Sequence, residues 1–194
     1  MILDFFRRLH GLVSDDGIRI YAPVSGKILP IEDVPDVVFS EKIAGDGIAI
    51  KPEGDRLVAP FDGTIVQVFE TNHAFAIRSE KNIEVLVHFG IDTVDLRGKG
   101  FKRLAESGQK VHKGDPIIGF SLKELESAAH STVTPVVISN LAELDVGRLN
   151  KADGEAVAGE TAILTLYMNE PKEGSPSETG SAAAPAADGE EEVR

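Results

Sequence analysis

The chain has 194 residues, of which 42% are hydrophobic, and its formal net charge of −12 argues against nucleic-acid binding, because a phosphate backbone is bound by a basic surface. The absence of cysteine excludes disulfides and thiolate metal sites, and no apolar run approaches the roughly 20 residues that span a bilayer. Since the N-terminus also lacks the features of a secretory signal, we expect a soluble cytoplasmic protein.

The first 17 residues, MILDFFRRLHGLVSDDG, have the spacing of an amphipathic helix. Such a helix either packs on the core of the protein or lies on an anionic membrane surface. The pair Arg7 and Arg8 favours the membrane surface, and hence a peripheral location at its inner face. We expect this segment, residues 1–17, to be separate from the domain that follows.

Residues 18–168 have the pattern of a β domain. Short runs of alternating apolar and polar residues are separated by Gly, Pro and Asp, as in sandwiches and barrels. We predict an all-β fold, an antiparallel β-sandwich with Greek-key or duplicated hairpin halves. One or two short helices are expected, at residues 100–108 and at residues 121–130, the second with a capping box from Ser121 to Glu124.

A repeat favours the duplicated halves. The stretch APVSGKI at residues 22–28 returns as APFDGTI at residues 59–65, so the frame A-P-x-x-G-x-I recurs after 37 residues (59 − 22 = 37). Proline restricts φ and glycine permits a positive φ in a turn. Each copy is therefore expected to open an equivalent hairpin.

Residues 169–194 form a tail of different composition, NEPKEGSPSETGSAAAPAADGEEEVR. The tail is rich in Ala, Gly, Pro, Ser and Glu, and it contains no Ile, Leu or Phe. Such a segment buries too little apolar surface to offset the entropy of ordering, so we expect an acidic, disordered tail.

His88 lies in an apolar run, VLVHFGIDT, at residues 85–93. Three explanations fit it: a packed core residue, a metal ligand or a nucleophile. Because side chains alternate between the faces of a strand, the run divides into two sets. The buried set is predicted to be Val85, Val87, Phe89 and Ile91, and the set on the outer face Glu84, Leu86, His88 and Asp92. We therefore expect His88 to face away from the core, beside an exposed Leu86.

His73, in FETNHAFAI at residues 69–77, is the second candidate. In a strand, Phe69, Thr71 and His73 share one face, which places a hydroxyl beside the imidazole. If the two strands are neighbours, His73 and His88 converge on one patch. If they are not, the two residues are unrelated surface histidines.

The segment IEDVPDVVFSEKIAGDG, residues 31–47, is unusually apolar for a stretch so rich in turn residues. Its exposed apolar residues are expected to be Val37, Val38, Phe39 and Ile43. The segment is either a plug of the core or a docking surface, and we favour docking.

Several long stretches in the same order carry a resemblance to a known family. They are IEDVPDVVFSEKIAGDGIAIKP, FETNHAFAI, VLVHFGIDTVDLRGKGFKRLAESGQKV and TPVVISN. Over about residues 18–168, the chain resembles the glucose-specific IIA components of the bacterial sugar phosphotransferase system.

This resemblance implies a phosphohistidine relay on an antiparallel β-sandwich. A histidine-containing phosphocarrier protein supplies the phosphoryl group, and the IIB domain of a glucose-type permease receives it on a cysteine. Matching motifs assign the phosphorylated residue to His88, in VHFG, and the supporting histidine to His73, in TNH. Thr71 would orient His73, and the carbonyl of Gly90 would hold the His88 ring. A strong basic clamp would hinder release of the group, and only Arg78 is near either histidine in the sequence.

The resemblance also implies that partners bind an apolar patch with acidic residues at its rim. This docking patch comprises Asp36, Val37, Val38, Phe39, Ile43, Phe69, Leu86, Asp92 and Val94. In this family, the unphosphorylated form inhibits non-phosphotransferase sugar permeases and glycerol kinase, and the phosphorylated form stimulates adenylate cyclase in some bacteria. A dianionic group added to an apolar docking surface acts as a local switch.

The relay requires no cofactor. In some complexes of the family, zinc is shared between the two histidines and a carboxylate of the partner. We therefore expect His73 and His88 to bind zinc only when a partner supplies the carboxylate, because two imidazoles fall short of the usual four ligands.

Two other functions are considered. A zinc-dependent hydrolase on a related β scaffold needs a third ligand and usually an H-x-H pair, and the chain lacks that pair. A lipoyl or biotinyl carrier domain has turns similar to APVSGKI and GQKVHKGDPI, but it needs an acceptor lysine in a context such as Met-Lys-Met, which the chain also lacks.

Overall fold

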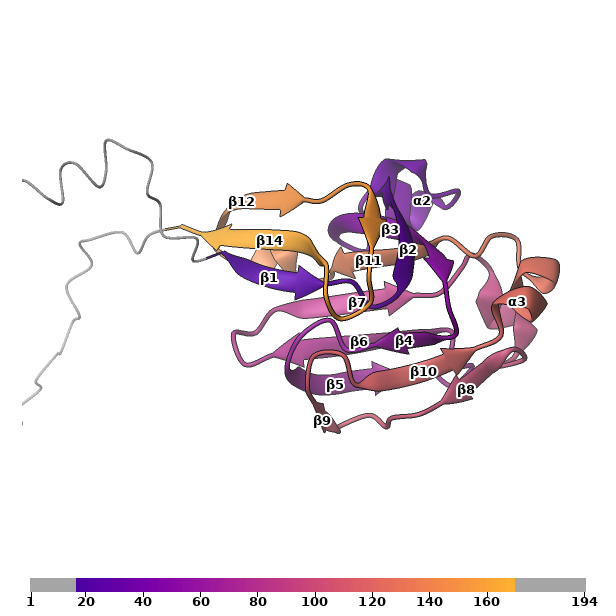
Figure 1. The fold of residues 1–194 in the computed structure, drawn as a ribbon. Coiled ribbons are helices and arrows are strands. Elements are labelled where there is room, and N and C mark those ends of the chain that lie inside the picture. Colours follow the sequence, from indigo (N-terminus) through magenta and orange to yellow (C-terminus); the bar gives the residue numbers. More distant parts are fainter. Residues whose placement is uncertain (1–16, 170–194) are drawn as a thin grey trace, which may run out of the picture.

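The computed structural model describes residues 17–169, and Figure 1 shows its fold. The N-terminal segment 1–17 and the tail 169–194 lie outside this range, apart from the one residue of each that adjoins the domain. What the sequence predicts for these two segments, and for the domain boundaries, therefore stays a prediction.

An eight-stranded antiparallel sheet is the main layer of the domain. Its strands in spatial order are β13 (Glu155–Ala156), β2 (Ser25–Pro30), β3 (Asp46–Glu53), β11 (Thr134–Ile138), β7 (Glu84–His88), β6 (Ala74–Ser79), β5 (Gly63–Val68) and β9 (Lys110–Val111). The alternating runs of the sequence form these strands because each buries one set of side chains and leaves the other set on the opposite face.

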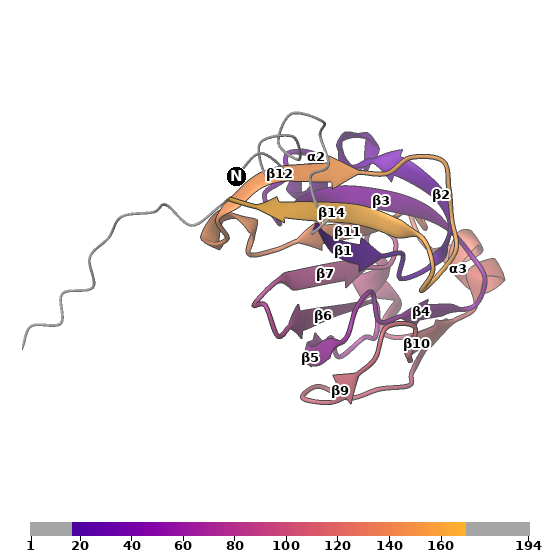
Figure 2. The same cartoon turned by 60° about the vertical axis from the view of Figure 1, so that its left-hand side comes forward.

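Two three-stranded sheets pack with the main sheet around a common core (Figures 1 and 2). Their strands are β1 (Ile18–Tyr21), β14 (Ala162–Met168) and β12 (Val146–Lys151) in one sheet, and β4 (Arg56–Val58), β10 (Pro116–Phe120) and β8 (Phe101–Arg103) in the other. Leu164 of β14, Ile118 of β10 and Phe75 of β6 are all buried in this larger core cluster. The predicted antiparallel β-sandwich is thus confirmed.

The opposite face of the main sheet carries a second, smaller core cluster. Along β3, Ile48 and Ile50 belong to the larger cluster, whereas Ala49 between them contacts the smaller one. Two short elements cover this face, the 3-10 helix η1 (Ile31–Asp33) and the helix α2 (Val37–Ser40). Phe39 of α2 is buried there. This face of the sheet holds the site described below.

The two copies of the sequence repeat contact each other through reciprocal backbone hydrogen bonds. The amide of Tyr21 donates to the carbonyl of Pro60 (2.9 Å), and the amide of Val58 donates to the carbonyl of Pro23 (2.8 Å). The two donor residues, Tyr21 and Val58, are 37 positions apart, and so are the two acceptor residues, Pro23 and Pro60 (58 − 21 = 60 − 23 = 37). This is the offset of the sequence repeat. Each copy of the repeat opens an antiparallel hairpin, β2–β3 after the first copy and β5–β6 after the second, as the sequence predicts.

One of the two helices expected from the sequence is present. The helix α3 (Leu122–Ala128) begins after Ser121, although that side chain makes no capping hydrogen bond. Residues 100–108, predicted as helical, instead contain the strand β8, because pairing with β10 and the positive φ of Gly100 and Gly108 outweigh the helical spacing. Within residues 17–169, no helix has the length and hydrophobicity required to cross a membrane.

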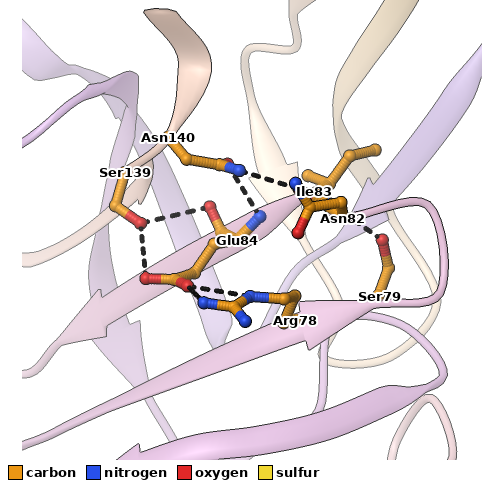
Figure 3. Close-up of polar contacts among 7 residues, drawn as sticks. All are labelled: Arg78, Ser79, Asn82, Ile83, Glu84, Ser139 and Asn140. Atoms are coloured by element: carbon orange, nitrogen blue, oxygen red, sulfur yellow. Dashed lines mark hydrogen bonds and ion pairs between the residues drawn. The ribbon is translucent and has the colours of Figure 1, made fainter. Parts of the chain in front are cut away.

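A polar cluster holds the hairpin β6–β7 at the end away from the site (Figure 3). The carboxylate of Glu84 accepts from Arg78 Nη2 (2.6 Å) and from the hydroxyl of Ser139 (3.2 Å). The side chain of Asn140 accepts from the Glu84 amide (2.9 Å) and donates to the carbonyl of Asn82 (2.7 Å). These contacts tie the hairpin to the residues that follow β11, between β11 and the 3-10 helix η3 (Leu141–Glu143).

Candidate functional site

His73 and His88 lie side by side. Strands β6 and β7 are antiparallel neighbours, and Ala74 pairs with His88, so His73 immediately precedes the residue opposite His88. Their ring centroids are 4.8 Å apart and the planes make an angle of 77°. His73 is 6% exposed, whereas His88 is half-buried. The structure thus brings together the two histidines that the sequence singles out.

The tautomer of His88 follows from one contact. Nδ1 of His88 lies 2.8 Å from the carbonyl oxygen of Gly90, and a carbonyl oxygen can only accept a hydrogen bond. Nδ1 therefore carries the proton, and the lone pair of the neutral ring is on Nε2. Phe39 packs against this ring with centroids 5.3 Å apart. The arrangement leaves Nε2 as the ring nitrogen with a free lone pair.

Both histidines favour the neutral form. Burial, and secondly the charge that His88 would carry, lower the pKa of His73 to about 4. Burial also lowers the pKa of His88, but the Gly90 carbonyl and the negative charges of Asp36 and Asp92 oppose this effect. The low pKa of His73 therefore leaves its ring uncharged at neutral pH.

His73 is positioned by a tight turn and not by a strand, so the predicted alternation of residues 69, 71 and 73 is wrong. Strand β5 ends at Val68 and β6 begins at Ala74. Between them the Asn72 amide donates to the carbonyl of Phe69 (2.9 Å), and Asn72 has a φ of +55°. The hydroxyl oxygen of Thr71 nevertheless lies 2.6 Å from Nδ1 of His73, because the turn folds it back.

A hollow of about 320 Å³ surrounds the two rings. Its lining residues come from the segment before β3, from the turn after β5, from β7 and from the segment that follows β7. They are Asp36, Val38, Phe39, Ala44, Phe69, His73, Leu86, His88, Ile91, Asp92 and Val94. Most of this surface is apolar, and the two carboxylates belong to residues at the beginning of α2 and of the 3-10 helix η2 (Thr93–Leu96).

The predicted docking patch is largely exposed around this hollow. Val37 is 63% exposed, Ile43 71%, and Val38 and Val94 just under half. Phe39 differs from the expectation, since it is 5% exposed and plugs the smaller core cluster beneath α2. The segment 31–47 therefore exposes apolar side chains on its outer side and plugs the smaller core cluster with Phe39.

Two further expectations on β7 need correction. Leu86 is half-buried against the smaller cluster and not freely exposed. Ile91 is buried, but in the smaller cluster and not with Val85 and Val87, because the chain turns at Gly90, whose φ is +69°. The predicted alternation therefore holds for residues 84–89 and fails after Gly90.

Sequence reasoning missed Thr93 and Arg103. The buried hydroxyl of Thr93 donates to the carbonyl of Phe89 (2.5 Å), and this contact closes the turn that contains Gly90. Arg103 contacts the turn before His73, whereas Arg78 pairs with Glu84. The Thr93 contact is local, between residues four positions apart, whereas Arg103 is about 30 positions from His73, so no local pattern marks Arg103.

A larger hollow, of about 880 Å³, lies between β1 and the strands β5, β6 and β9. Its lining includes Ile18, Phe61 and Lys110 but neither His73 nor His88. We place the site at the smaller hollow because that one contains the paired imidazoles.

Comparison with known proteins identifies the family. Residues 18–144, more than half of the chain, match the family described as the phosphoenolpyruvate-dependent sugar phosphotransferase system, EIIA 1. The chain belongs to this family. It is therefore a phosphotransferase component that relays a phosphoryl group in sugar transport, and its partners are the other members of the phosphotransfer chain. Neither the hydrolase nor the lipoyl-type carrier alternative is favoured by these matches.

Individual relatives agree with this assignment. The glucose-specific EIIA component of Haemophilus influenzae is 56% identical over 166 residues, which cover 84% of this chain and 99% of the relative. The N-acetylglucosamine-specific EIICBA component of Escherichia coli is 46% identical over 148 residues, which cover 76% of this chain but only 23% of that longer protein. The glucose permease IIA structure from Mycoplasma capricolum has a TM-score of 0.71 and 32% identity, and the match covers 77% of this chain and 96% of that one.

Proposed function

We propose that Nε2 of His88 accepts the phosphoryl group from the phosphohistidine of the phosphocarrier protein. The phosphorus–nitrogen bond of the donor breaks as the bond from phosphorus to Nε2 forms. No proton has to leave His88, because its only N–H proton is on Nδ1, 2.8 Å from the Gly90 carbonyl. In the second step, a cysteine thiolate of the IIB domain attacks phosphorus, and the lone pair returns to Nε2. The Gly90 contact is the observation that carries this assignment.

His73 supports the group on its neighbour. If the Thr71 hydroxyl donates to Nδ1 of His73, the ring carries its proton on Nε2. That N–H then donates to a phosphoryl oxygen bound to His88, whose ring centroid is 4.8 Å away. Phosphoryl transfer depends mainly on positioning and charge stabilisation, and a neutral donor provides both without an ion pair that slows release.

The phosphocarrier protein and the IIB domain bind in turn to the docking patch. Exposed Val37, Val38 and Ile43 provide apolar contact, while Asp36 and Asp92 meet basic side chains at the rim. Charge complementarity at a rim mainly accelerates encounter and selects partners, which suits a fast and transient relay.

The sugar and the regulatory targets are inferred from relatives. We propose that the chain serves a glucose-type permease, since several relatives are named glucose-specific. Non-phosphotransferase permeases and glycerol kinase would bind the unphosphorylated patch, and adenylate cyclase would respond to the phosphorylated form. Phosphorylation adds a dianion at the centre of an apolar surface, which favours partners with basic side chains over those with apolar ones.

Zinc is proposed only for complexes. His73 and His88 offer two nitrogen ligands, and residues 17–169 contain no group of three His, Cys, Asp or Glu side chains arranged for a metal ion. Because zinc usually takes four ligands, a partner carboxylate has to complete such a site.

The N-terminal segment 1–17 would hold the protein at an anionic membrane surface. Co-sedimentation of the full chain with anionic vesicles and with neutral vesicles tests this proposal.

Phosphoryl labelling tests the proposed relay. The full chain is incubated with phosphoenolpyruvate, the first enzyme of the system and the phosphocarrier protein. We expect a gain of one acid-labile phosphoryl group, abolished in His88→Gln. In His73→Gln, labelling persists while transfer to the IIB domain fails. Labelling of His88→Gln at the wild-type level would contradict the assignment of the acceptor, and normal transfer by His73→Gln would contradict that of the supporting residue.

A further inference from the structure

The position of His73 depends on the turn that precedes it. Only residues 69–73 separate β5 from β6, and the turn is closed by the hydrogen bond from the Asn72 amide to the Phe69 carbonyl. Asn72 has a φ of +55°, a left-handed conformation that costs free energy in residues other than glycine, although Asn tolerates it well. Such a turn keeps its geometry only if the surrounding structure fixes it.

Arg103 makes the side-chain contacts that fix this turn. From the end of β8, its Nε donates to the side-chain oxygen of Asn72 (2.8 Å), and its Nη2 donates to the carbonyls of Phe69 (2.9 Å) and Val68 (3.3 Å). One planar guanidinium thus joins the end of β5 and both ends of the turn to a strand more than 30 residues further along the chain. Its rigid fork suits several acceptors at once, which an ammonium group does not.

The remaining contact of Arg103 excludes a direct role on the phosphoryl group. Nη1 pairs with the carboxylate of Glu106 (3.2 Å), so every nitrogen of the guanidinium donates to an acceptor within the protein. The side chain is 29% exposed and is not among the residues that line the hollow around the histidines. Arg103 therefore acts on the site through the turn and not by binding the ligand.

We propose that Arg103 is a positioning residue of the relay: by clamping residues 68–72, it holds Thr71 against His73 and so sets His73 beside His88. This inference rests on the supporting role proposed for His73. Under this proposal, the Arg103 cation does not retain the phosphoryl group, because its guanidinium contacts the turn and not the hollow. The arginine still orders His73, which donates the hydrogen bond. The pairing of Thr71 with His73 (2.6 Å) is the feature that a loosened turn would lose first.

Arg103→Gln tests the proposal, with Arg78→Gln as its matched control. Arg78 belongs to the same hairpin and pairs with Glu84 at the opposite end (Figure 3), so its loss removes an arginine contact without reaching the turn. We expect Arg103→Gln to be labelled at His88 like wild type. Its transfer to the IIB domain should be slower by about 10- to 100-fold, since small misplacements of a positioned group have effects of that size. Arg78→Gln should transfer normally.

Two readouts separate positioning from general loss of structure. In ¹⁵N NMR spectra, the His73 ring of Arg103→Gln should change its shifts and titrate closer to an ordinary histidine, while the His88 signals change little. Adding Arg103→Gln to Thr71→Val, a variant with only a partial loss of transfer, should slow transfer by less than the product of the two separate effects, because both changes weaken the same contact between Thr71 and His73. Additive losses, or His73 signals identical to wild type, would overturn the proposal.

A second variant covers the case in which Arg103→Gln does not fold. Arg103→Lys retains the charge and most of the apolar stem, but cannot reach the three acceptors with one planar group. It should fold with the same fingerprint spectrum as wild type and still show slower transfer. Wild-type transfer by Arg103→Lys or Arg103→Gln, with His73→Gln impaired, would reject the role of Arg103 alone. Normal transfer by His73→Gln would instead reject the proposed function on which it rests.

Discussion

The carbonyl oxygen of Gly90 lies 2.8 Å from Nδ1 of His88 and thereby leaves Nε2 as the free nitrogen of the ring. The contact depends on glycine at position 90. The φ of Gly90 is +69°, and a Cβ there would lie 2.6 Å from the carbonyl oxygen of Ser131 and from Cγ2 of Thr93. A side chain at this position would therefore move the carbonyl that orients the His88 ring.

Gly90→Ala should consequently lower both stability and labelling. We expect a loss of roughly 2–4 kcal/mol in the free energy of unfolding, from the left-handed backbone and the overpacking together. Phosphorylation of His88 should slow as the ring loses its hydrogen bond. Gly108→Ala is the control, since Gly108 has a φ of +83° with no atom within 4 Å of an added Cβ. Urea denaturation and labelling rates compare the two, and equal effects would contradict the predicted clash.

The pKa of His73 predicts a pH-dependent stability. Because burial lowers this pKa to about 4, the unfolded chain takes up the proton first as the pH falls. Above the ordinary histidine pKa of about 6.5, burial of the neutral ring does not reduce the free energy of unfolding. As the pH falls from about 6.5 towards about 4, this free energy decreases, by up to on the order of 3 kcal/mol. His73→Gln lacks this titration, so its free energy of unfolding should fall less over that range. Denaturation curves of both proteins at several pH values measure the difference, and parallel curves would refute it.

Removal of the Thr71 hydroxyl should impair transfer but not acceptance. Thr71→Val retains the shape of the side chain and loses the 2.6 Å contact with Nδ1 of His73. A hydrogen bond of about 1 kcal/mol corresponds to a roughly fivefold slower transfer to the IIB domain. Thr71→Ser, which restores a hydroxyl, should recover most of the rate. Equal rates for the Val and Ser variants would show that the methyl group, and not the hydroxyl, is what matters.

A charge on the docking patch should weaken partner binding without unfolding the domain. Val38 lines the hollow and is 42% exposed, so Val38→Asp puts a carboxylate on the apolar surface at little cost to stability. We expect affinity for the phosphocarrier protein to fall about tenfold or more, since apolar contacts near the centre of an interface dominate binding. Val157→Asp, at a residue that is 50% exposed and outside the hollow, is the matched control. Titration calorimetry compares them, and an equal loss in both variants would count against this patch.

The fold could be predicted because its strands repeat a simple alternation. The meeting of His73 and His88 also follows from sequence once β6 and β7 are neighbours, since residue 74 then lies opposite residue 88. The prediction failed where conformation depends on single residues with a positive φ. Asn72 converts an apparent strand into a turn, and Gly90 sends Ile91 to the other side of the sheet.

Contacts between distant parts of the chain left no sequence signal. Nothing in the stretch GFKRLAESG distinguishes an exposed helical arginine from Arg103, whose partners are contributed by a turn about 30 residues earlier. The burial of Phe39 was equally hidden, because α2 has only four residues and shows no periodicity that could separate its inner from its outer side chains. Both facts depend on how the elements pack.

The hairpins opened by the two copies of the repeat differ in the length of their connections. The connection from β2 to β3 spans residues 31–45, and the equivalent one from β5 to β6 spans only residues 69–73. Both tips reach the same hollow, where the long one supplies Val38 and the short one His73. One connection thus supplies exposed apolar side chains to the hollow, and the other supplies an imidazole. Grafting a different 31–45 loop onto this scaffold should therefore redirect the relay to new protein clients and leave its histidine chemistry intact.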